Sequence, residues 1–348
     1  MSALQLQADQ ASPATLVGAC VGIDVSKAKL DVAVRWRVAS PGQREPKPLH
    51  KQVSNDARGF ARLHKWLQAQ VAHEAIERVG LEASGRYGEA LAYFLVEHDY
   101  PVSYINPKLI HAFGKMFLHR SKTDKQDALL IAHFCELHRP DLFRPASELF
   151  QVLQQRARRL KALQKMRQME CNRLQSGITD ELVLAQIRAA IAYFDQLIQC
   201  IQAAIDELFA QHDELAHDRR LLVSIKGIGK KTATLLLAEL GDIRRFDSPR
   251  QLAAFIGITP LQVQSGTSVR KPGEISKEGN ARIRAGLYMP AVVAKRWNKP
   301  CRQLAQRLEA KRKPGNVVVI AVMRKLVHQV HGILKSGLPF DPNFENSA

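Results

Sequence analysis

Four acidic residues in the N-terminal part of the chain have the types and positions needed for metal-assisted chemistry. Asp24 lies at the end of one short β-branched run, and Glu82 directly follows another. Asp124 and Asp127 are three residues apart at the start of a helical pattern, so they share one face of that helix. Two acids at strand ends and two on one helix face make four candidate ligands.

Carboxylates that are brought together repel, by about 4 kcal/mol per pair at ~4 Å and an effective dielectric constant near 20. A hard divalent cation relieves this repulsion. Oxygen ligands suit Mg²⁺ or Mn²⁺, and two such ions can flank a scissile phosphate. A lone Asp near a helix start is more commonly an N-cap, and this alternative stays open for Asp127.

The segment that carries these acids alternates between strand and helix patterns. Two β-branched runs separated by three residues predict a hairpin, and single strands and helices then follow in alternation. This order predicts an α/β domain with one mixed sheet. The expected strands are 19–25, 29–34, 79–81 and 102–105, and the expected helices are 58–71, 88–98 and 107–117.

The middle of the chain has a different pattern. Apolar residues at alternating three- and four-residue steps predict a coiled-coil helix, and a second helical stretch, 149–174, ends at Ser176-Gly177. We expect an antiparallel helical hairpin whose seam either packs within the chain or serves as an oligomerisation arm. The seam residues are Leu184, Ile187, Ile191, Phe194, Ile198, Ile201, Ile205 and Leu208.

Charge is concentrated in the last third of the chain. The 348 residues carry a formal net charge of +18, of which residues 218–348 contribute 24 basic and 9 acidic side chains. Such an excess favours a nucleic-acid partner. The charge distribution predicts a flexible N-terminus (1–16), an α/β domain (17–147), coiled-coil helices (148–217), a basic C-terminal domain (218–340) and a tail (341–348).

A glycine-rich basic loop precedes a helical run in this last third. Two glycines before a helix N-terminus expose backbone N–H groups to an anion, and the adjacent lysines add charge. The pattern indicates a helix-hairpin-helix-like element that holds DNA phosphates, or else a glycine-mediated packing turn. Its residues are Lys226, Gly227, Gly229, Lys230 and Lys231.

Ser265, followed by a glycine, lies in a second basic loop near Arg270, Lys277 and Arg284. On residue chemistry alone, this serine is typical of a solvated turn. A serine hydroxyl needs a base or a metal to become a nucleophile, and no histidine lies close in sequence.

Several runs in this order resemble the DEDD transposases of bacterial insertion sequences, a family that includes the Piv-type DNA invertases. The N-terminal runs are 22–31, 82–87, 106–107 and 122–128, and the C-terminal runs are 255–260, 265–270, 276–280, 284–289, 323–326 and 338–341. The chain departs from the family at Lys226, where proline is common, and at Ser84, where threonine is common.

The resemblance implies an RNase H-like, RuvC-type fold for the first domain and a mainly helical C-terminal transposase domain. It also implies that Asp24, Glu82, Asp124 and Asp127 bind Mg²⁺ or Mn²⁺ and that Ser265 is the nucleophile toward DNA. Asp31 falls in the same motif, but its strand alternation favours a structural or surface role.

The implied activity is a site-specific DNA recombination that passes through a phosphoserine link. The resemblance further implies a noncoding bridge RNA that pairs with target and donor DNA, and a homo-oligomer, a dimer that forms a tetramer in the synapse, in which serine and acids meet between subunits. We expect Arg270, Lys277 and Arg284 mainly to hold the phosphate backbone.

Two rival functions use the same residues differently. A metal-dependent, RuvC-like Holliday-junction nuclease would use the four acids with water as the nucleophile. A non-catalytic DNA- or RNA-binding architectural protein would use the acids only as helix caps and the basic loops only for binding.

The remaining composition predicts an intracellular protein, and the resemblance implies a bacterial cytoplasmic, nucleoid-associated one. The N-terminus lacks the pattern of a signal peptide, and we expect no apolar run that approaches the ~18 residues of a membrane span. Five scattered cysteines without a CxxC motif predict buried free thiols rather than disulfides or a zinc site.

Overall fold

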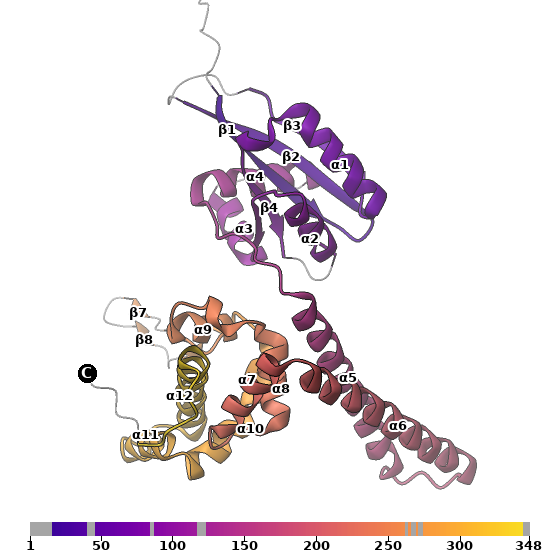
Figure 1. Cartoon of the computed structure of the whole chain (residues 1–348), viewed down its shortest axis with the longest axis vertical. Helices are drawn as coiled ribbons and strands as arrows, with labels where there is room; N and C mark the ends of the chain where they lie inside the picture. The colour runs from indigo at the N-terminus through magenta and orange to yellow at the C-terminus, as the bar shows by residue number, and fades with distance from the viewer. Residues whose placement is uncertain are drawn as a thin grey trace, which may run out of the picture. The chain divides into compact units, whose positions relative to one another are not determined.

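The computed structural model describes residues 16–39, 46–83, 87–116, 123–261, 264–265, 269–270 and 274–343, with the side chains of 264, 265, 269 and 270 left out. The chain divides into two compact units, residues 1–145 and 146–348 (Figure 1). The predicted coiled-coil and C-terminal segments both belong to the second unit. Most of the expected flexible N-terminus and residues 344–348 of the expected tail lie outside the described residues.

The first unit is built on a five-stranded mixed sheet with the order β3-β2-β1-β4-β5. β1 pairs antiparallel with β2 and parallel with β4, as the predicted hairpin followed by strand–helix alternation requires. This is the arrangement expected of an RNase H-like domain. The elements are β1 (Leu16–Val25), β2 (Lys29–Val38), β3 (Leu49–Ser54), α1 (Ala57–Gln70), β4 (Ile76–Glu82), α2 (Glu89–Glu97), β5 (Val102–Ile105), α3 (Pro107–Met116) and α4 (Asp124–His138).

The two faces of the sheet carry different helices. Ala19, Val21 and Ile23 of β1 pack in one apolar cluster with residues of α1 and α2. Cys20, which points to the opposite face, packs in a second cluster with residues of α3 and α4. Because side chains alternate along a strand, Gly22 and Asp24 share the α4 face with Cys20.

The expected buried free thiols are confirmed at three positions. Cys20, Cys135 and Cys301 are free and buried, whereas Cys200 is exposed on the outer face of a helix. Burial raises the pKa of each buried thiol to about 12, so these three stay protonated and unreactive near neutral pH.

The second unit begins with the predicted helical hairpin, formed by α5 (Glu148–Leu174) and α6 (Glu181–Gln211). Arg167 of α5 binds Asp195 of α6 through two hydrogen bonds of 2.6 and 3.1 Å, and Arg156 donates to the Ala204 carbonyl at 2.6 Å. The helices therefore run antiparallel. All eight predicted seam residues are buried or half-buried.

The rest of the second unit is a helical body around α12 (Figure 1). By length and composition α12 could cross a membrane, so the expectation that no apolar run is long enough was wrong. More than half of the most apolar 18-residue stretch of α12 is buried inside the body, where α12 forms the central core helix. The body comprises α7 (Asp213–Ser224), α8 (Lys230–Leu240), α9 (Pro249–Ile256), α10 (Ala281–Trp297), α11 (Lys299–Ala310), α12 (Gly315–Ser336) and the short strands β6 (Pro260–Leu261), β7 (Gln264–Ser265), β8 (Val269–Arg270) and β9 (Glu274–Ile275).

A buried ion pair ties the hairpin to the body. Glu239 of α8 has a side chain that is 1% exposed, and Arg158 of α5 donates two hydrogen bonds to it at 2.8 and 2.9 Å. Asn280, at the start of α10, donates a third at 3.0 Å. Burial alone would raise the pKa of Glu239, but these hydrogen bonds outweigh it and keep the pKa below its ordinary value.

We predict that Arg158→Ala lowers the free energy of unfolding by about 3 kcal/mol, because it leaves a buried carboxylate without its main partner. Chemical denaturation followed by circular dichroism measures the change. The matched control is Arg188→Ala, which removes an exposed pair with Glu181 and should cost at most about 0.5 kcal/mol. Equal losses in the two variants would contradict the structural role of Glu239.

Candidate active site

Two glycines allow α4 to lie directly against the sheet. A Cβ atom on Gly22 of β1 would lie 2.0 Å from the Ala128 carbonyl oxygen and 2.3 Å from the Ala132 amide nitrogen of α4. A Cβ on Gly80 of β4 would lie 2.4 Å from the Cys135 sulfur. No larger residue fits at Gly22 unless the helix moves, so this close approach fixes where α4 begins relative to the strand ends.

Three acids lie on the α4 face of the sheet near those strand ends. Asp24 and Glu82 each come two residues after a glycine that contacts α4, so their side chains point to the same face. Asp31 of β2 is the direct cross-strand partner of Asp24. It is buried and accepts a hydrogen bond of 2.7 Å from Gln52, so of its two expected roles the structure favours the structural one.

The other two acids lie in the first turn of α4. Thr123 is the N-cap, and its side chain accepts a hydrogen bond from the Gln126 amide. Asp127 is therefore not the cap of this helix, and the capping alternative considered for it was wrong. Asp124, the first helical residue, is exposed, and Asp127, one turn later, is half-buried.

The pKa of Asp24 reflects both its burial and the acids around it. Burial, and then the negative charges around it, raise the pKa of Asp24 from 3.8 to about 6. A carboxyl group with this pKa is partly protonated near neutrality and is suited to exchange a proton. The contributing acids are, in decreasing order, Asp127, Glu82, Asp124 and Asp31.

Lys29, which the sequence analysis did not single out, supplies positive charge to this cluster. Its ammonium group lies 2.6 Å from Asp124 and 3.5 Å from Asp31. The hydrogen bond with Asp124 is the main reason why the pKa of Lys29 is raised. Among the described residues, no three acidic, histidine or cysteine side chains lie close enough to hold a metal ion. The oxygen donors and the unrelieved charge at Asp24 nevertheless fit a hard divalent cation.

In the second unit, the predicted glycine-rich loop connects α7 to α8. Gly227 has a φ of +111°, and a Cβ on it would lie 2.8 Å from the Ala294 side chain and 2.9 Å from the Pro290 carbonyl oxygen of α10. Of the two roles that the sequence allowed for this loop, Gly227 therefore has the packing role. Gly229 is exposed at the N-cap of α8 with open space around it, and the three lysines of the loop, Lys226, Lys230 and Lys231, are exposed.

Ser265 lies in a small hairpin, where β7 pairs with β8 in the register Ser265↔Val269 and Gln264↔Arg270. β6 precedes this hairpin in the sequence and β9 follows it. The two strands pair with each other, so they form the stem of the hairpin. The side chains of Ser265 and Arg270 lie outside the described part of the structure, as does the Ser84-Gly85-Arg86 part of the N-terminal motif.

The two other basic residues of this region have different surroundings. Lys277 is exposed, has a φ of +54° and lies 3.9 Å from Glu274. Arg284 is half-buried and donates to the Ile256 carbonyl oxygen at 3.0 Å, at the end of α9. Lys277 thus faces solvent, whereas part of the Arg284 guanidinium holds two helices together.

We predict that Asp24→Asn stabilises the metal-free protein at pH 7 to 8. Because the pKa of Asp24 is raised on folding, its ionisation costs stability as the pH rises above about 4, and the cost is complete above pH 6. After allowance for solvent screening, we expect a gain of about 1–2 kcal/mol that fades as the pH falls towards 4. Denaturation curves between pH 4 and 8 in the presence of a chelator measure it.

The control for this substitution is Asp56→Asn. Asp56 caps α1, and the hydrogen bond from the Gly59 amide is the main cause of its lowered pKa, so loss of its charge should reduce stability at pH 7. If both variants lost stability at pH 7, the charge repulsion inferred at Asp24 would be wrong.

We further predict that Gly227→Ala lowers the free energy of unfolding by about 2 kcal/mol, because it adds a Cβ at a positive φ and against the α10 backbone. The matched variant Gly229→Ala should lower it by at most about 1 kcal/mol, since nothing surrounds that position and only the N-cap preference for glycine over alanine is lost. Thermal melts of both variants test the difference, and equal effects would contradict the packing role of Gly227.

Comparison with known proteins connects both units to one family. A family model described as "Transposase" matches residues 21–182, and a model of the IS116/IS110/IS902 transposase family matches residues 219–306. A RuvC structure from Thermus thermophilus matches 36% of this chain and 99% of its own, with 15% identity and a TM-score of 0.27.

Curated relatives match over most of the chain. The pilin gene-inverting proteins of Moraxella bovis and Moraxella lacunata are each 34% identical over 332 residues, which cover 92% of this chain and 97% of each relative. The transposase of an insertion sequence from Coxiella burnetii, IS1111A, is 26% identical over 53% of the chain. The first unit thus matches a transposase model, the basic helical body matches another, and the chain belongs to the IS110 family of DEDD transposases and recombinases.

Proposed function

We propose that this recombinase cuts and rejoins DNA strands with Ser265 as the nucleophile and with Asp24, Glu82, Asp124 and Asp127 as the ligands of Mg²⁺ or Mn²⁺. The observation that supports the metal site is the close approach of α4 to Gly22, which brings the first turn of α4 to the strand ends, where burial and the other acids raise the pKa of Asp24. A chain that gathers these charges beside a packed helix gives up stability there, as active sites commonly do.

The proposed step transfers a phosphoryl group and conserves a phosphodiester. The Ser265 hydroxyl gives its proton to a carboxylate of the acidic cluster, and its oxygen forms a bond to the DNA phosphorus. The bond from phosphorus to one deoxyribose oxygen breaks, and that oxygen takes up a proton. Reversal of the step with a different DNA end rejoins the strand, so no ATP is needed.

The charge of the acidic cluster supports a role for a divalent cation. When bound, such an ion offsets the repulsion between the acids and stabilises the negative charge that develops on the phosphate. The carboxylates orient the ion, and Lys29 relieves part of their charge in its absence, since it lies 2.6 Å from Asp124.

The basic body of the second unit is the proposed nucleic-acid surface. The exposed lysines 226, 230, 231 and 277, together with the backbone N–H groups at Gly227 and Gly229, suit phosphate contacts. Arg270 and the part of Arg284 not bound to Ile256 would add to them. We propose that target and donor DNA bind here and that a noncoding bridge RNA selects them by base pairing, at the nucleoid of a bacterial cytoplasm.

The helical hairpin supports a homo-oligomer. Several apolar residues of the seam between α5 and α6 are only half-buried, and Leu182 and Tyr193 of α6 are exposed. We propose that a second subunit covers this apolar surface, and that the serine of one subunit works with the acids of another in a dimer or tetramer.

We predict that the wild-type protein, incubated with end-labelled substrate DNA and Mn²⁺, leaves a labelled strand attached to protein under denaturing conditions. Ser265→Ala should abolish this product, because no other group forms the covalent link, and Asp24→Asn should reduce it at least 100-fold. The matched control Ser276→Ala, directly after the stem strand β9, should retain the product.

The same gel separates the rival functions. Cleavage that persists in Ser265→Ala, without attached protein, would indicate a nuclease that uses water and would overturn the serine mechanism. Binding without any cleavage, in every variant and with either metal ion, would indicate an architectural protein.

A further inference from the structure

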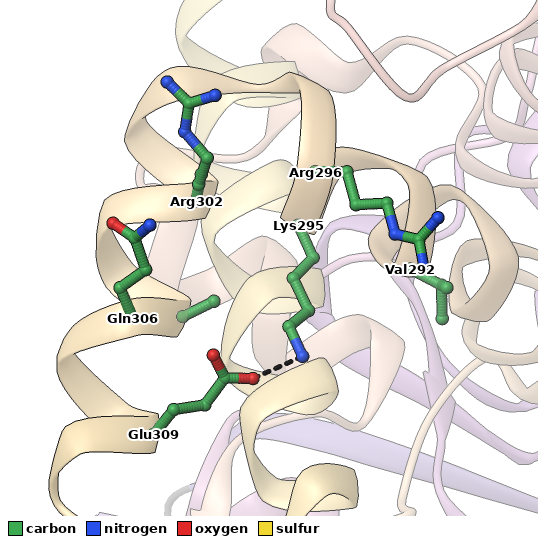
Figure 2. A pocket seen from close by; sticks show the side chains of 7 residues that line it. Val292, Lys295, Arg296, Arg302, Gln306 and Glu309 are labelled. Atoms are coloured by element: carbon green, nitrogen blue, oxygen red, sulfur yellow. Dashed lines mark ion pairs between the residues drawn. The ribbon is translucent and has the colours of Figure 1, made fainter.

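A pocket between α10 and α11 lies outside every site described above. Val292, Lys295 and Arg296 line it from α10, and Arg302, Gln306 and Glu309 line it from α11 (Figure 2). Its volume is about 400 Å³. Five of its seven lining side chains end in polar or charged groups, and their aliphatic stems, with Val292 and Ala305, supply apolar surface as well.

The charge of the pocket favours an anion. Lys295 points across the pocket to Glu309 and forms an ion pair with it (Figure 2). Arg296 and Arg302 are exposed, and neither forms an ion pair within the described part of the chain. The whole stretch 281–313 contains ten basic residues and one acidic residue, Glu309. Two free guanidinium groups on adjacent helices are suited to a phosphate.

An exposed tryptophan directly follows Arg296, one of the residues that line this pocket. Its side chain, that of Trp297, is 73% exposed, whereas Ala294, one turn earlier on the same helix, is fully buried in the core of the helical body. Val293 and Met289, one and two turns earlier on α10, are 43% and 62% exposed, so the aromatic ring ends an apolar stripe. An exposed aromatic ring among cations is the combination that binds unpaired bases, because each base offers a flat π-face while its phosphate meets the positive charge.

Residues beside Trp297 on α10 contact the glycine-rich loop. Ala294, one turn before Trp297, is the residue against which Gly227 packs. Asn298, the residue after Trp297, is fully buried and donates to the Lys226 carbonyl oxygen at 3.3 Å and to Gln329 at 3.0 Å. The backbone on either side of Trp297 is therefore anchored to the glycine-rich loop and to α12.

We propose that Arg296, Trp297, Arg302 and Gln306 form a binding site for an unpaired nucleotide of a single-stranded nucleic acid. The base stacks on the Trp297 indole, the two guanidinium groups bind the adjacent phosphates, and the Gln306 amide is placed to hydrogen-bond the sugar or the phosphate. A duplex is excluded from the stacking contact, because its bases are already paired and stacked inside the helix. The site is independent of Ser265 and of the acidic cluster.

The test compares single strands with duplexes on the full-length protein. The probes are a fluorescent mixed-sequence RNA of about 15 nucleotides, the DNA of the same sequence, and their duplexes, measured by anisotropy at a fixed salt concentration. Trp297→Ala should weaken binding of single strands about 10-fold or more, and should change duplex affinity less than 2-fold. Trp297→Phe should restore most of the lost affinity, because its ring still stacks.

Two controls separate stacking from misfolding. Leu338→Ala removes a comparably exposed apolar side chain outside the basic stretch and should leave every affinity unchanged. In the wild type, single strands should quench tryptophan fluorescence, and this quenching should decrease in Trp297→Phe, whose melting curve should match that of the wild type. Arg296→Ala combined with Arg302→Ala should reduce the salt dependence of single-strand binding.

The two probe sugars identify the source of the strand. A loss in Trp297→Ala that is larger for RNA assigns the site to an RNA, and a loss that is as large or larger for DNA assigns it to an unpaired DNA strand. Unchanged single-strand affinity in Trp297→Ala, or an equal loss for duplexes, would overturn the proposal. None of these measurements needs catalysis. The binding results would therefore still test this site if the Ser265 mechanism proved wrong.

Discussion

The acidic site depends on the contact between the backbone of α4 and Gly22. Because nothing separates the strand from the helix at this point, the first turn of α4 lies at the same sheet edge as the end of β1. The carboxylates of Asp24 and Asp127 are thereby brought into mutual influence, although about a hundred residues separate them in the chain. Burial energy from the α4 face, where Ile131 and Cys135 are fully buried, opposes the repulsion that results.

The repulsion is relieved only in part. Lys29 pairs with Asp124, the acid that is most exposed, and Gln52 donates a hydrogen bond to the buried Asp31. Asp24 has neither kind of partner among the interactions that shift its pKa, and its pKa is raised accordingly. Unfavourable charge thus acts on the half-buried Asp24, and a site of this kind is suited to a cation or a proton.

The sequence was informative where periodicity or motif order determines the outcome. The hairpin of β1 and β2, the antiparallel pair α5 and α6, and the positions of Asp24 and Glu82 at strand ends follow from alternation and heptad spacing. β3 was not predicted, because its residues alternate weakly and its pairing with β2 stabilises it. Partners distant in sequence were also missed: Lys29 on Asp124, Arg158 on Glu239, and Arg284 on the Ile256 carbonyl depend on packing that no local pattern encodes.

Asn298 has a mechanical consequence for the second unit. Its amide group joins the loop before α8, the corner between α10 and α11, and α12, through Lys226, its own capping bond to Cys301, and Gln329. These hydrogen bonds therefore keep the distances between the three elements constant. A polynucleotide that contacts both the glycine-rich loop and the corner must have phosphates spaced to match the distance between them. This surface would therefore select strands by the spacing of their backbone phosphates rather than by their base sequence.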